Sequence, residues 1–321
     1  MIESAFSEYF GKSSREAYGI ALFELAAKDE RIVALTSDVP ESVRFSKFRD
    51  SWPERFFDFG IAEQNMMSAA AGLARSGKLP YVSVYAIFAS LRAIEQARTD
   101  IAYPGLPVKI IASHSGISLG PGGPTHHSIE DIAVYRSIAN MTIAVPADGV
   151  ETAEIIRASH SLPGPLYVRL SREAEPPVYQ SEGIFTFGKS RQVRGGGDIT
   201  IIACGAPVGR ALNAADQLIN QGIQVRLIDM ATIKPLDKAA IIDAAKQTGL
   251  ILTVEEHNII GGLGSAVAEV IAEAGIHAKM LRLGIPDEFT LAAPYQDLIA
   301  HYRLDEVGIT EAVKALLARY T

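Results

Sequence analysis

The first half of the chain alternates short apolar runs with longer amphipathic segments. The apolar runs have the length and composition of buried strands, and they occupy residues 32–36, 81–85, 108–112, 141–145 and 166–170. Helix-like segments stand between some of these runs, at residues 14–28, 62–74 and 91–103. Ser13 or Ser14 can cap the first helix. The alternation predicts an α/β fold in which a mainly parallel sheet is flanked by helices.

The second half repeats this alternation after a break. Residues 173–188 contain Pro176, Pro177 and scattered polar residues, which are typical of a linker. Beyond it, strand-like and helix-like segments alternate again, with strands at 199–204, 224–228, 250–255 and 279–283 and helices at 208–221 and 265–274. We therefore expect two α/β domains, at residues 1–175 and 191–321, joined by a linker at 176–190.

Composition and charge narrow the classes of function. Hydrophobic residues make up 48% of the 321 residues, which suits a folded protein, and the formal net charge of −7 comes without a basic tract. We therefore expect neither nucleic acid nor a membrane as a partner. The single cysteine, Cys204, cannot form an intramolecular disulfide. Residues 1–12 lack the features of a secretory leader, and no apolar run reaches membrane-spanning length, so we expect a cytoplasmic protein.

Glu63 lies at the junction between a predicted strand and a predicted helix. The aromatic run at 56–59 is typical of a buried strand, Gly60 follows it, and the next helix carries Glu63 on its first turn. In open α/β sheets, ligands bind at this kind of junction. The alternative is an acid that has no ligand and is stabilised there by the helix dipole.

A loop rich in glycine and histidine follows the predicted strand at 108–112. Residues 113–127 contain four glycines, two prolines and three histidines, a composition that excludes a regular element. We expect the glycines to let the backbone approach a ligand closely. Three histidines could indicate zinc, but no cysteine or close acid completes a tetrahedral set, so we expect no metal ligands in this chain.

These motifs and others, in order, resemble those of the thiamine-diphosphate enzymes of the transketolase type. They are the Glu63 segment at 56–66, the loop at 119–126, and the stretches at 131–133, 145–148, 170–172 and 253–262. Together they span nearly the whole chain. The resemblance implies the C-terminal half of a transketolase, with a pyrimidine-binding domain followed by a transketolase C-terminal domain.

The resemblance implies a catalytic role for Glu63. It matches the glutamate that hydrogen-bonds the aminopyrimidine ring of thiamine diphosphate and promotes the tautomer that activates the cofactor. We expect its carboxyl group to be buried among Phe59, Ile61 and Met66. Such burial favours the neutral form of the carboxyl group, whereas the start of a helix favours the charged form.

Other residues match cofactor and substrate positions of the family. Phe88, and after it Tyr85, are the candidates for the aromatic face against the pyrimidine. Asp38 matches an acid on the cofactor side. His126 matches the catalytic histidine that hydrogen-bonds substrate oxygens near the reacting carbon. Its neighbour His127 stands where transketolases often carry glutamine, and we assign it no role.

The positions that bind the sugar phosphate in the family match Arg15, Ser42 and Arg172 in this sequence. His114 matches a residue that contacts the phosphate or a sugar hydroxyl. The planar, charged guanidinium group of arginine and the hydroxyl group of serine can both hydrogen-bond phosphate oxygens. Each of these residues alone would be an ordinary surface side chain, but together they favour a phosphorylated sugar. Gly122 stands where many transketolases have an acid. We hypothesise that it leaves more room and alters the choice of sugar, so that a branched or unusual ketose phosphate is used.

One part of a transketolase has no counterpart in this sequence. The Gly-Asp-Gly and Asn pattern that holds Mg²⁺ and the diphosphate is absent, since Gly197-Asp198 leads directly into a predicted strand. The resemblance therefore implies that an N-terminal partner subunit supplies the diphosphate half and the Mg²⁺ ligands. We expect the two subunits to assemble into a heterotetramer.

The reaction implied is transfer of a two-carbon ketol unit from a ketose phosphate to an aldose phosphate. The alternatives are a deoxyxylulose phosphate synthase-like enzyme, the beta subunit of a 2-oxo acid dehydrogenase, and a non-catalytic partner subunit that retains the fold. We expect Glu255 and His257 to have a packing or interface role. The glycines at 261–264 lack the full dinucleotide fingerprint and predict a tight structural turn.

Overall fold

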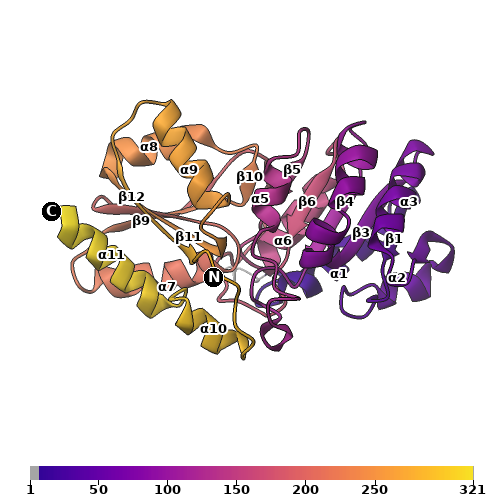
Figure 1. Cartoon of the computed structure of the whole chain (residues 1–321), viewed down its shortest axis with the longest axis horizontal. Helices are drawn as coiled ribbons and strands as arrows, with labels where there is room; N and C mark the ends of the chain where they lie inside the picture. Colours follow the sequence, from indigo (N-terminus) through magenta and orange to yellow (C-terminus); the bar gives the residue numbers. More distant parts are fainter. Residues whose placement is uncertain (1–6, 321) are drawn as a thin grey trace, which may run out of the picture.

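The computed structural model describes residues 7–320, which form two α/β bodies side by side (Figure 1). Residues 1–6 are outside this range. They are the first half of the segment 1–12, which was predicted not to be a secretory leader. The first body consists of α1 (Ser14–Ala26), β1 (Ile32–Thr36), α2 (Ser46–Ser51), β2 (Phe56–Asp58), α3 (Glu63–Arg75), β3 (Leu79–Tyr85), α4 (Ile94–Gln96), β4 (Lys109–Ser113), α5 (Asp131–Arg136), β5 (Thr142–Ala144), α6 (Gly149–Ser159) and β6 (Leu166–Arg169).

The second body lies towards the C-terminus, coloured from salmon to yellow in Figure 1. It consists of β7 (Arg191–Arg194), β8 (Ile199–Ala203), α7 (Pro207–Ile219), β9 (Val225–Asp229), α8 (Lys238–Thr248), β11 (Leu250–Asn258), α9 (Leu263–Glu273), β12 (Lys279–Ile285), α10 (Tyr295–His301) and α11 (Glu306–Tyr320). Its sheet has the order β12-β11-β8-β9-β7, in which only β7 runs antiparallel to its neighbour. The four strands predicted for this part are confirmed.

The sheet of the first body brings the ends of distant segments together. Its order is β10-β5-β6-β4-β3-β1-β2, where β10 is Thr232–Lys234, and strands β1 to β6 pair in parallel. The register places Thr36 beside Ser83, and Tyr85 beside Ser113. The carboxyl ends of β1, β3 and β4 therefore lie next to one another, and the residues that follow them share one edge of the sheet.

The start of helix α1 is capped by one of the two serines predicted for that role. Ser13 is the N-cap of α1, with its Oγ accepting from the Glu16 N–H (3.4 Å) while Glu16 Oε2 accepts from the Ser13 N–H (3.2 Å). This reciprocal capping box satisfies two otherwise unpaired backbone donors. Of the two serines that could cap the helix, Ser13 does so, and Arg15 is held on the first turn.

Two sequence predictions for the first body are wrong in detail. The aromatic run forms β2, but Phe56 and Phe57 are only half-buried and Asp58 is exposed, because β2 is the edge strand and pairs with β1 alone. The segment predicted as one helix at 91–103 contains two π-helical stretches, Phe88–Arg92 and Ala97–Ala102, on either side of α4. Such π-turns are frequent at functional sites.

A short strand from beyond the linker joins the first sheet. β10 (Thr232–Lys234) pairs antiparallel with β5, with Thr232 beside Ala144.

The linker region between β6 and β7 contains no helix or strand, but hydrogen bonds hold it in place. The backbone N–H groups of Val178 and Tyr179 both donate to Asp148 (2.8 Å), and the Tyr179 hydroxyl donates to Asp229 (2.8 Å). The two bodies are thus tied together by a shared sheet and by the linker.

Within residues 7–320, no helix has the length and apolar character needed to cross a membrane.

Candidate active site

A cavity of about 420 Å³ opens at the carboxyl ends of β1 and β3. We call it the Glu63 cavity. All the residues predicted to be catalytic or to bind the cofactor lie in its wall, which is formed by Ser37, Asp38, Val39, Ile61, Glu63, Val84, Tyr85, Phe88, Arg92, Thr125 and His126. The position agrees with the rule that ligands bind outside the carboxyl ends of parallel strands.

Glu63 is the first residue of α3 and is only 2% exposed. Met66, one turn further on, is fully buried beside it, but Ile61 is 76% exposed. The prediction that Ile61 helps to bury the carboxyl group is therefore wrong, because Ile61 lies in the open turn that follows edge strand β2. Because Glu63 begins α3, its carboxylate lies at the positive end of that helix, and no side chain of residues 7–320 caps the helix start.

Arg92 is the partner of Glu63 that sequence reasoning missed. Its Nη1 donates to both carboxylate oxygens, at 2.9 and 3.1 Å. Its guanidinium carbon also lies 4.0 Å from the centre of the Phe88 ring, a cation–π contact. The position of Arg92, four residues after Phe88, was the available signal, and the π-helical stretch Phe88–Arg92 brings the two side chains together.

A row of aromatic rings runs out of the Glu63 cavity. Phe88 and Tyr85 are stacked with ring centres 6.0 Å apart, and Tyr85 lies 4.1 Å from the His114 ring. His126 meets Phe88 edge-on at 5.6 Å. The Tyr85 hydroxyl donates to Ser42 Oγ (3.2 Å). Tyr85 therefore connects the cavity with the residues predicted to bind phosphate.

Three arginines, Arg15, Arg44 and Arg172, form what we call the arginine cluster. Arg15 Nε donates to the carbonyl of Arg172 (3.0 Å), and its Nη1 donates to the carbonyl of Ser42 (2.9 Å). Arg44 and Arg172 each pair with a carboxylate, but Arg15 has no such partner within residues 7–320. Burial, and then the charges of the other two arginines, lowers the pKa of the Arg15 guanidinium. The cluster has an excess of positive charge, which suits an anion.

His114 follows β4 and lies against the arginine cluster. It is 2% exposed, and its Nδ1 is 2.8 Å from Ser113 Oγ. Burial, with smaller contributions from the three arginines, lowers the pKa of His114 to about 3. His114 is therefore neutral at physiological pH and can hydrogen-bond without adding charge. Its φ is +57°, and Asp38 and Arg44 are also in the left-handed region at +60° and +65°, which is costly for side chains other than glycine.

The two histidines of the loop have different surroundings. His126 is half-buried, with Nδ1 3.0 Å from Thr125 Oγ1, and its ring faces the Glu63 cavity. His127 is buried, with Nε2 2.9 Å from the Gly120 carbonyl and Nδ1 2.6 Å from Thr290 Oγ1 in the second body. The structure thus brings His126 to the candidate site and turns His127 away from it.

The expectation of extra room at Gly122 is wrong. A Cβ added there would lie 2.9 Å from side-chain atoms of Leu119 and 3.0 Å from the His126 Cβ. The space beside Gly122 is already filled by its own loop. Any effect of this glycine on substrate choice would have to act by displacing His126.

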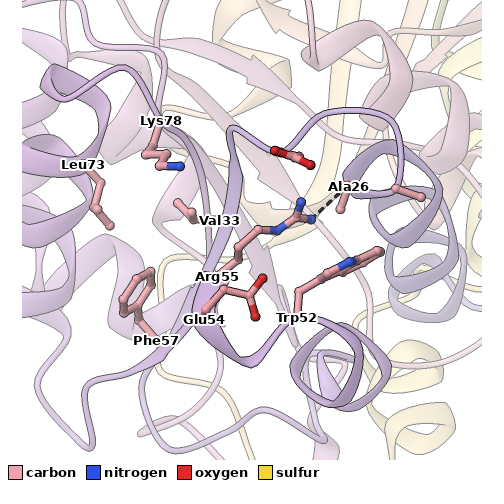
Figure 2. A pocket seen from close by; sticks show the side chains of 10 residues that line it. Ala26, Val33, Trp52, Glu54, Arg55, Phe57, Leu73 and Lys78 are labelled. Atoms are coloured by element: carbon pink, nitrogen blue, oxygen red, sulfur yellow. Dashed lines mark hydrogen bonds between the residues drawn. The ribbon is translucent and has the colours of Figure 1, made fainter.

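Figure 2 shows a second cavity, of about 410 Å³. Its wall includes Val33, near the start of β1, and Lys78, just before β3, so it lies at the opposite end of the same strands. We call it the Trp52 cavity. Arg55 is its only charged residue that is more than nine-tenths buried; its Nη2 donates to the Ala26 carbonyl (2.9 Å), and its guanidinium carbon lies 4.5 Å from the Trp52 ring. These contacts tie the end of α1 to the start of β2. Arg55 is thereby explained as a structural residue.

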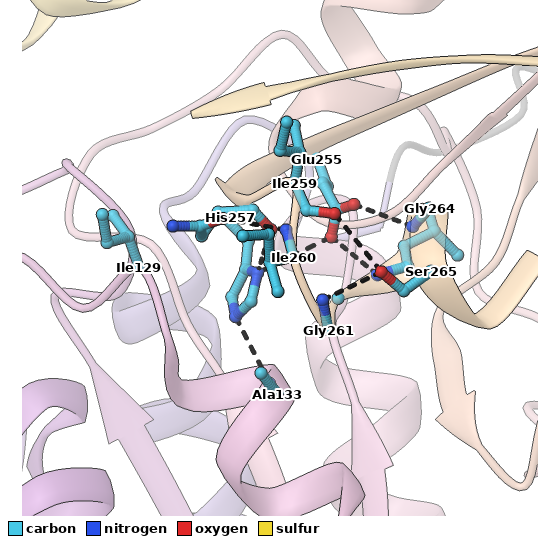
Figure 3. A network of polar contacts seen from close by, with 12 residues as sticks. Ile129, Ala133, Glu255, His257, Ile259, Ile260, Gly261, Gly264 and Ser265 are labelled. Carbon is cyan, nitrogen blue, oxygen red and sulfur yellow. Dashed lines mark hydrogen bonds and ion pairs between the residues drawn. The ribbon is translucent and has the colours of Figure 1, made fainter. Parts of the chain in front are cut away.

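Glu255 and His257 have the packing and interface role predicted for them (Figure 3). Glu255 accepts from the N–H groups of Leu263 (2.6 Å) and Gly264 (2.7 Å) at the start of α9, and burial raises its pKa to about 7. His257 accepts from the Ala133 N–H (3.3 Å) of the first body, and burial lowers its pKa to about 4. The glycine turn before α9 is therefore structural.

Comparison with known proteins agrees with this geometry. Residues 11–177 match the family model described as the transketolase pyrimidine-binding domain, and residues 188–309 match that of the transketolase C-terminal domain. A Methanocaldococcus jannaschii protein, provisionally described as a transketolase C-terminal section, is 43% identical over 94% of this chain and 95% of its own length. One of the subunits of the apulose-4-phosphate transketolase of Phocaeicola vulgatus is 41% identical over 92% of this chain and 94% of its own length.

A solved structure described as a split-gene transketolase, inactive beta4 tetramer, superimposes with a TM-score of 0.87. It is 41% identical, and the match covers 96% of this chain and 99% of that one. The fold, the two domain matches and these relatives lead to one conclusion: the chain belongs to the transketolase family and corresponds to its pyrimidine-binding and C-terminal domains.

Proposed function

We propose that this chain is the C-terminal subunit of a split, thiamine-diphosphate-dependent transketolase, which transfers a two-carbon ketol unit from a ketose phosphate to an aldose phosphate. The observation that carries the proposal is a juxtaposition. A buried carboxylate in a cavity and the positively charged arginine cluster lie at the same edge of the sheet. Tyr85 lies between them, since it contacts Phe88 of the cavity and Ser42 and His114 beside the cluster.

The residues of the Glu63 cavity suit the pyrimidine end of the cofactor. Thiamine diphosphate, when bound, supplies a carbanion that can attack a carbonyl and stabilise the resulting charge. Glu63 would hydrogen-bond the aminopyrimidine and share a proton with it, while Phe88 and Tyr85 offer the aromatic face and Asp38 lies at the rim. Arg92 holds the Glu63 carboxylate in place, and its side chain, 44% exposed, has room to move when the cofactor binds.

The arginine cluster suits the phosphate of the sugar. Arg15 and Arg172, with the Ser42 hydroxyl, would bind the phosphate oxygens, because guanidinium groups match their geometry. Neutral His114 would hydrogen-bond the phosphate or an adjacent hydroxyl. His126, in the wall of the Glu63 cavity, would hydrogen-bond substrate oxygens near the reacting carbon and stabilise charge that develops there.

We further propose an N-terminal partner subunit that supplies the diphosphate-binding half and the Mg²⁺ ligands, with assembly to a heterotetramer in the cytoplasm. Two relatives of about the same length, one described as a C-terminal section and the other as one subunit of a transketolase, support a separate partner chain. The relative named for apulose 4-phosphate also supports a branched or non-standard ketose phosphate as the donor.

The test is to mix this chain with its separately expressed candidate partner, thiamine diphosphate and Mg²⁺, and to measure ketol transfer from a panel of ketose phosphates. Each subunit alone is the control. We expect activity only in the mixture and its loss in Glu63→Ala. Decarboxylation of 2-oxo acids would instead indicate a dehydrogenase beta subunit, and condensation of pyruvate with a triose phosphate would indicate a deoxyxylulose phosphate synthase-like enzyme. A stable complex without any turnover would indicate a non-catalytic subunit.

A further inference from the structure

We infer that the second body sets the position of His126, and that His127 and Thr290 are positioning residues for the reaction; this rests on the role of His126 in the proposed function. The loop that carries His126 belongs to the first body, but it packs against the second. Residues beyond the linker contact it near its beginning, in its middle and at its end.

The glycines of the loop are close to the second body. A Cβ at Gly120 would lie 2.9 Å from the carbonyl oxygen of Ala293, and one at Gly123 would lie 3.0 Å from the Cβ of Ala292. Both glycines have a positive φ, at +54° and +67°. The sequence predicted that these glycines serve the approach of a ligand. Within residues 7–320, what approaches them most closely is the segment at 292–295.

The beginning of the loop is held by a carboxylate of the second body. Glu256 Oε1 accepts from the Ile117 N–H at 3.0 Å, and its Oε2 accepts from the Tyr295 hydroxyl at 2.6 Å. Glu256 is 3% exposed, so these hydrogen bonds are shielded from water. One buried side chain thus connects the loop with the segment at 292–295.

His127 closes the end of the loop. A carbonyl oxygen can only accept, so the contact of Nε2 with the Gly120 carbonyl requires a hydrogen on Nε2. Nδ1 of the neutral ring then accepts from the Thr290 hydroxyl. Burial lowers the pKa of His127, which agrees with a neutral ring. The ring of His127 therefore bridges Gly120 and Thr290, and His126 is the residue directly before it in the chain.

Loss of the Thr290 hydroxyl would leave a buried ring nitrogen without its donor, and the ring could then change tautomer or move. His126 lies edge-on to Phe88 at 5.6 Å, so a small shift of the loop would displace it from the Glu63 cavity. Misplacing a catalytic group by about 1 Å can lower a rate about 100-fold. The side chains of the arginine cluster come from other segments. Within residues 7–320, the loop meets the cluster only through Ser118, which accepts from the Arg172 N–H (3.2 Å), and His114, so phosphate binding should change less than the rate.

The experiment compares Thr290→Val with Thr290→Ser in the assembled two-subunit enzyme. We expect Thr290→Val to lower kcat about tenfold, because the shift of His126 should be well under 1 Å and so cost less than the loss of about 100-fold for a misplacement of about 1 Å. KM for the sugar phosphate should change less than about twofold. Thr290→Ser, which keeps the hydroxyl, should retain most of the activity. Thr253→Val is the matched control, since the Thr253 hydroxyl is buried and makes no hydrogen bond within the described residues.

A second readout does not depend on turnover. In the isolated chain, the NMR signals of the His126 and His127 rings, assigned with His126→Gln and His127→Gln, should shift in Thr290→Val and not in Thr290→Ser or Thr253→Val. Unchanged signals and unchanged kcat in Thr290→Val would overturn the inference. If the assembled wild type shows no ketol transfer, the proposed function fails, whereas the NMR comparison still decides whether Thr290 positions the loop.

Discussion

The Glu63 cavity and the Trp52 cavity lie at opposite ends of the same parallel strands and have nearly the same volume, about 420 and 410 Å³. Each contains a buried charged side chain next to an aromatic ring: Glu63 is 2% exposed and Arg55 is 8% exposed. Burial of a charge therefore does not by itself distinguish the proposed active site from the Trp52 cavity.

What distinguishes the two ends is the backbone and the sign of the charges around it. Of the five non-glycine residues with positive φ in residues 7–320, three, Asp38, Arg44 and His114, lie at the Glu63 end. The arginine cluster adds positive charges that are not fully paired. At the Trp52 end, the lining contains two cations, Arg55 and Lys78, and two acids, Glu30 and Glu54, so the charges balance in number. The strained backbone and the excess positive charge at the Glu63 end indicate a ligand-binding site. Among the described residues, the Trp52 end has neither feature.

The largest expected effect comes from changing Glu63. Glu63→Gln keeps the size of the side chain but removes the acid, so kcat should fall at least about 100-fold, as is typical when a proton-transferring group is lost. The matched control at the other cavity is Glu54→Gln, which should leave kcat unchanged. Steady-state rates of the assembled enzyme decide this, and equal rates for the two variants would remove the distinction between the cavities.

Arg15→Ala should weaken binding of the sugar phosphate. A charge-assisted hydrogen bond contributes about 1.5 to 3 kcal/mol, so KM should rise about tenfold to a hundredfold. Arg49, an arginine that pairs with Glu41 and Asp50, provides the control variant Arg49→Ala. A donor substrate without phosphate should show no difference between Arg15→Ala and wild type. If KM for the phosphorylated donor stays constant, the arginine cluster does not bind the phosphate.

Arg55→Ala should affect the folded state without affecting the chemistry. It removes the hydrogen bond to the Ala26 carbonyl and the contact with Trp52, so the free energy of unfolding should fall by about 2 to 3 kcal/mol. Below the melting transition, kcat should match that of wild type. Urea denaturation followed by fluorescence measures the first effect. A drop in kcat without loss of stability would indicate a functional role for the Trp52 cavity.

The smallest expected effect is a pH dependence caused by His114. Its pKa is about 3 in the folded chain and about 6.5 when unfolded, so the unfolded chain binds the extra proton as the pH falls below 6.5. Stability therefore decreases with falling pH, by about 1 to 2 kcal/mol between pH 7 and pH 5. His114→Gln should show a shallower decrease over that range, while the other histidines contribute equally to both proteins. Parallel curves would contradict the burial of a neutral His114.

Local patterns in the sequence were sufficient for much of the fold. The apolar run at 32–36 is β1 itself, because a short run of branched and small apolar residues can satisfy a buried parallel strand. Helix α3 begins one residue after its predicted start, since a glycine turn and a run of small residues determine where it forms. The residues predicted to face the cofactor line one cavity for a related reason. Each ends a strand, follows one or begins a helix, and parallel strands bring those ends to the same edge.

The sequence alone determined the family, the two α/β domains and five of the residues that meet in the candidate site, namely Asp38, Glu63, Tyr85, Phe88 and His126. Only the tertiary structure decided what each of those residues touches. β10 joined the sheet of the other body, Ile61 remained exposed, and Arg92 paired with Glu63. It also placed the loop glycines against residues about 170 positions further along the chain. The physical reason is that strand and helix formation depend on neighbours in sequence, whereas burial, ion pairs and close backbone contacts depend on segments that meet only when the chain folds.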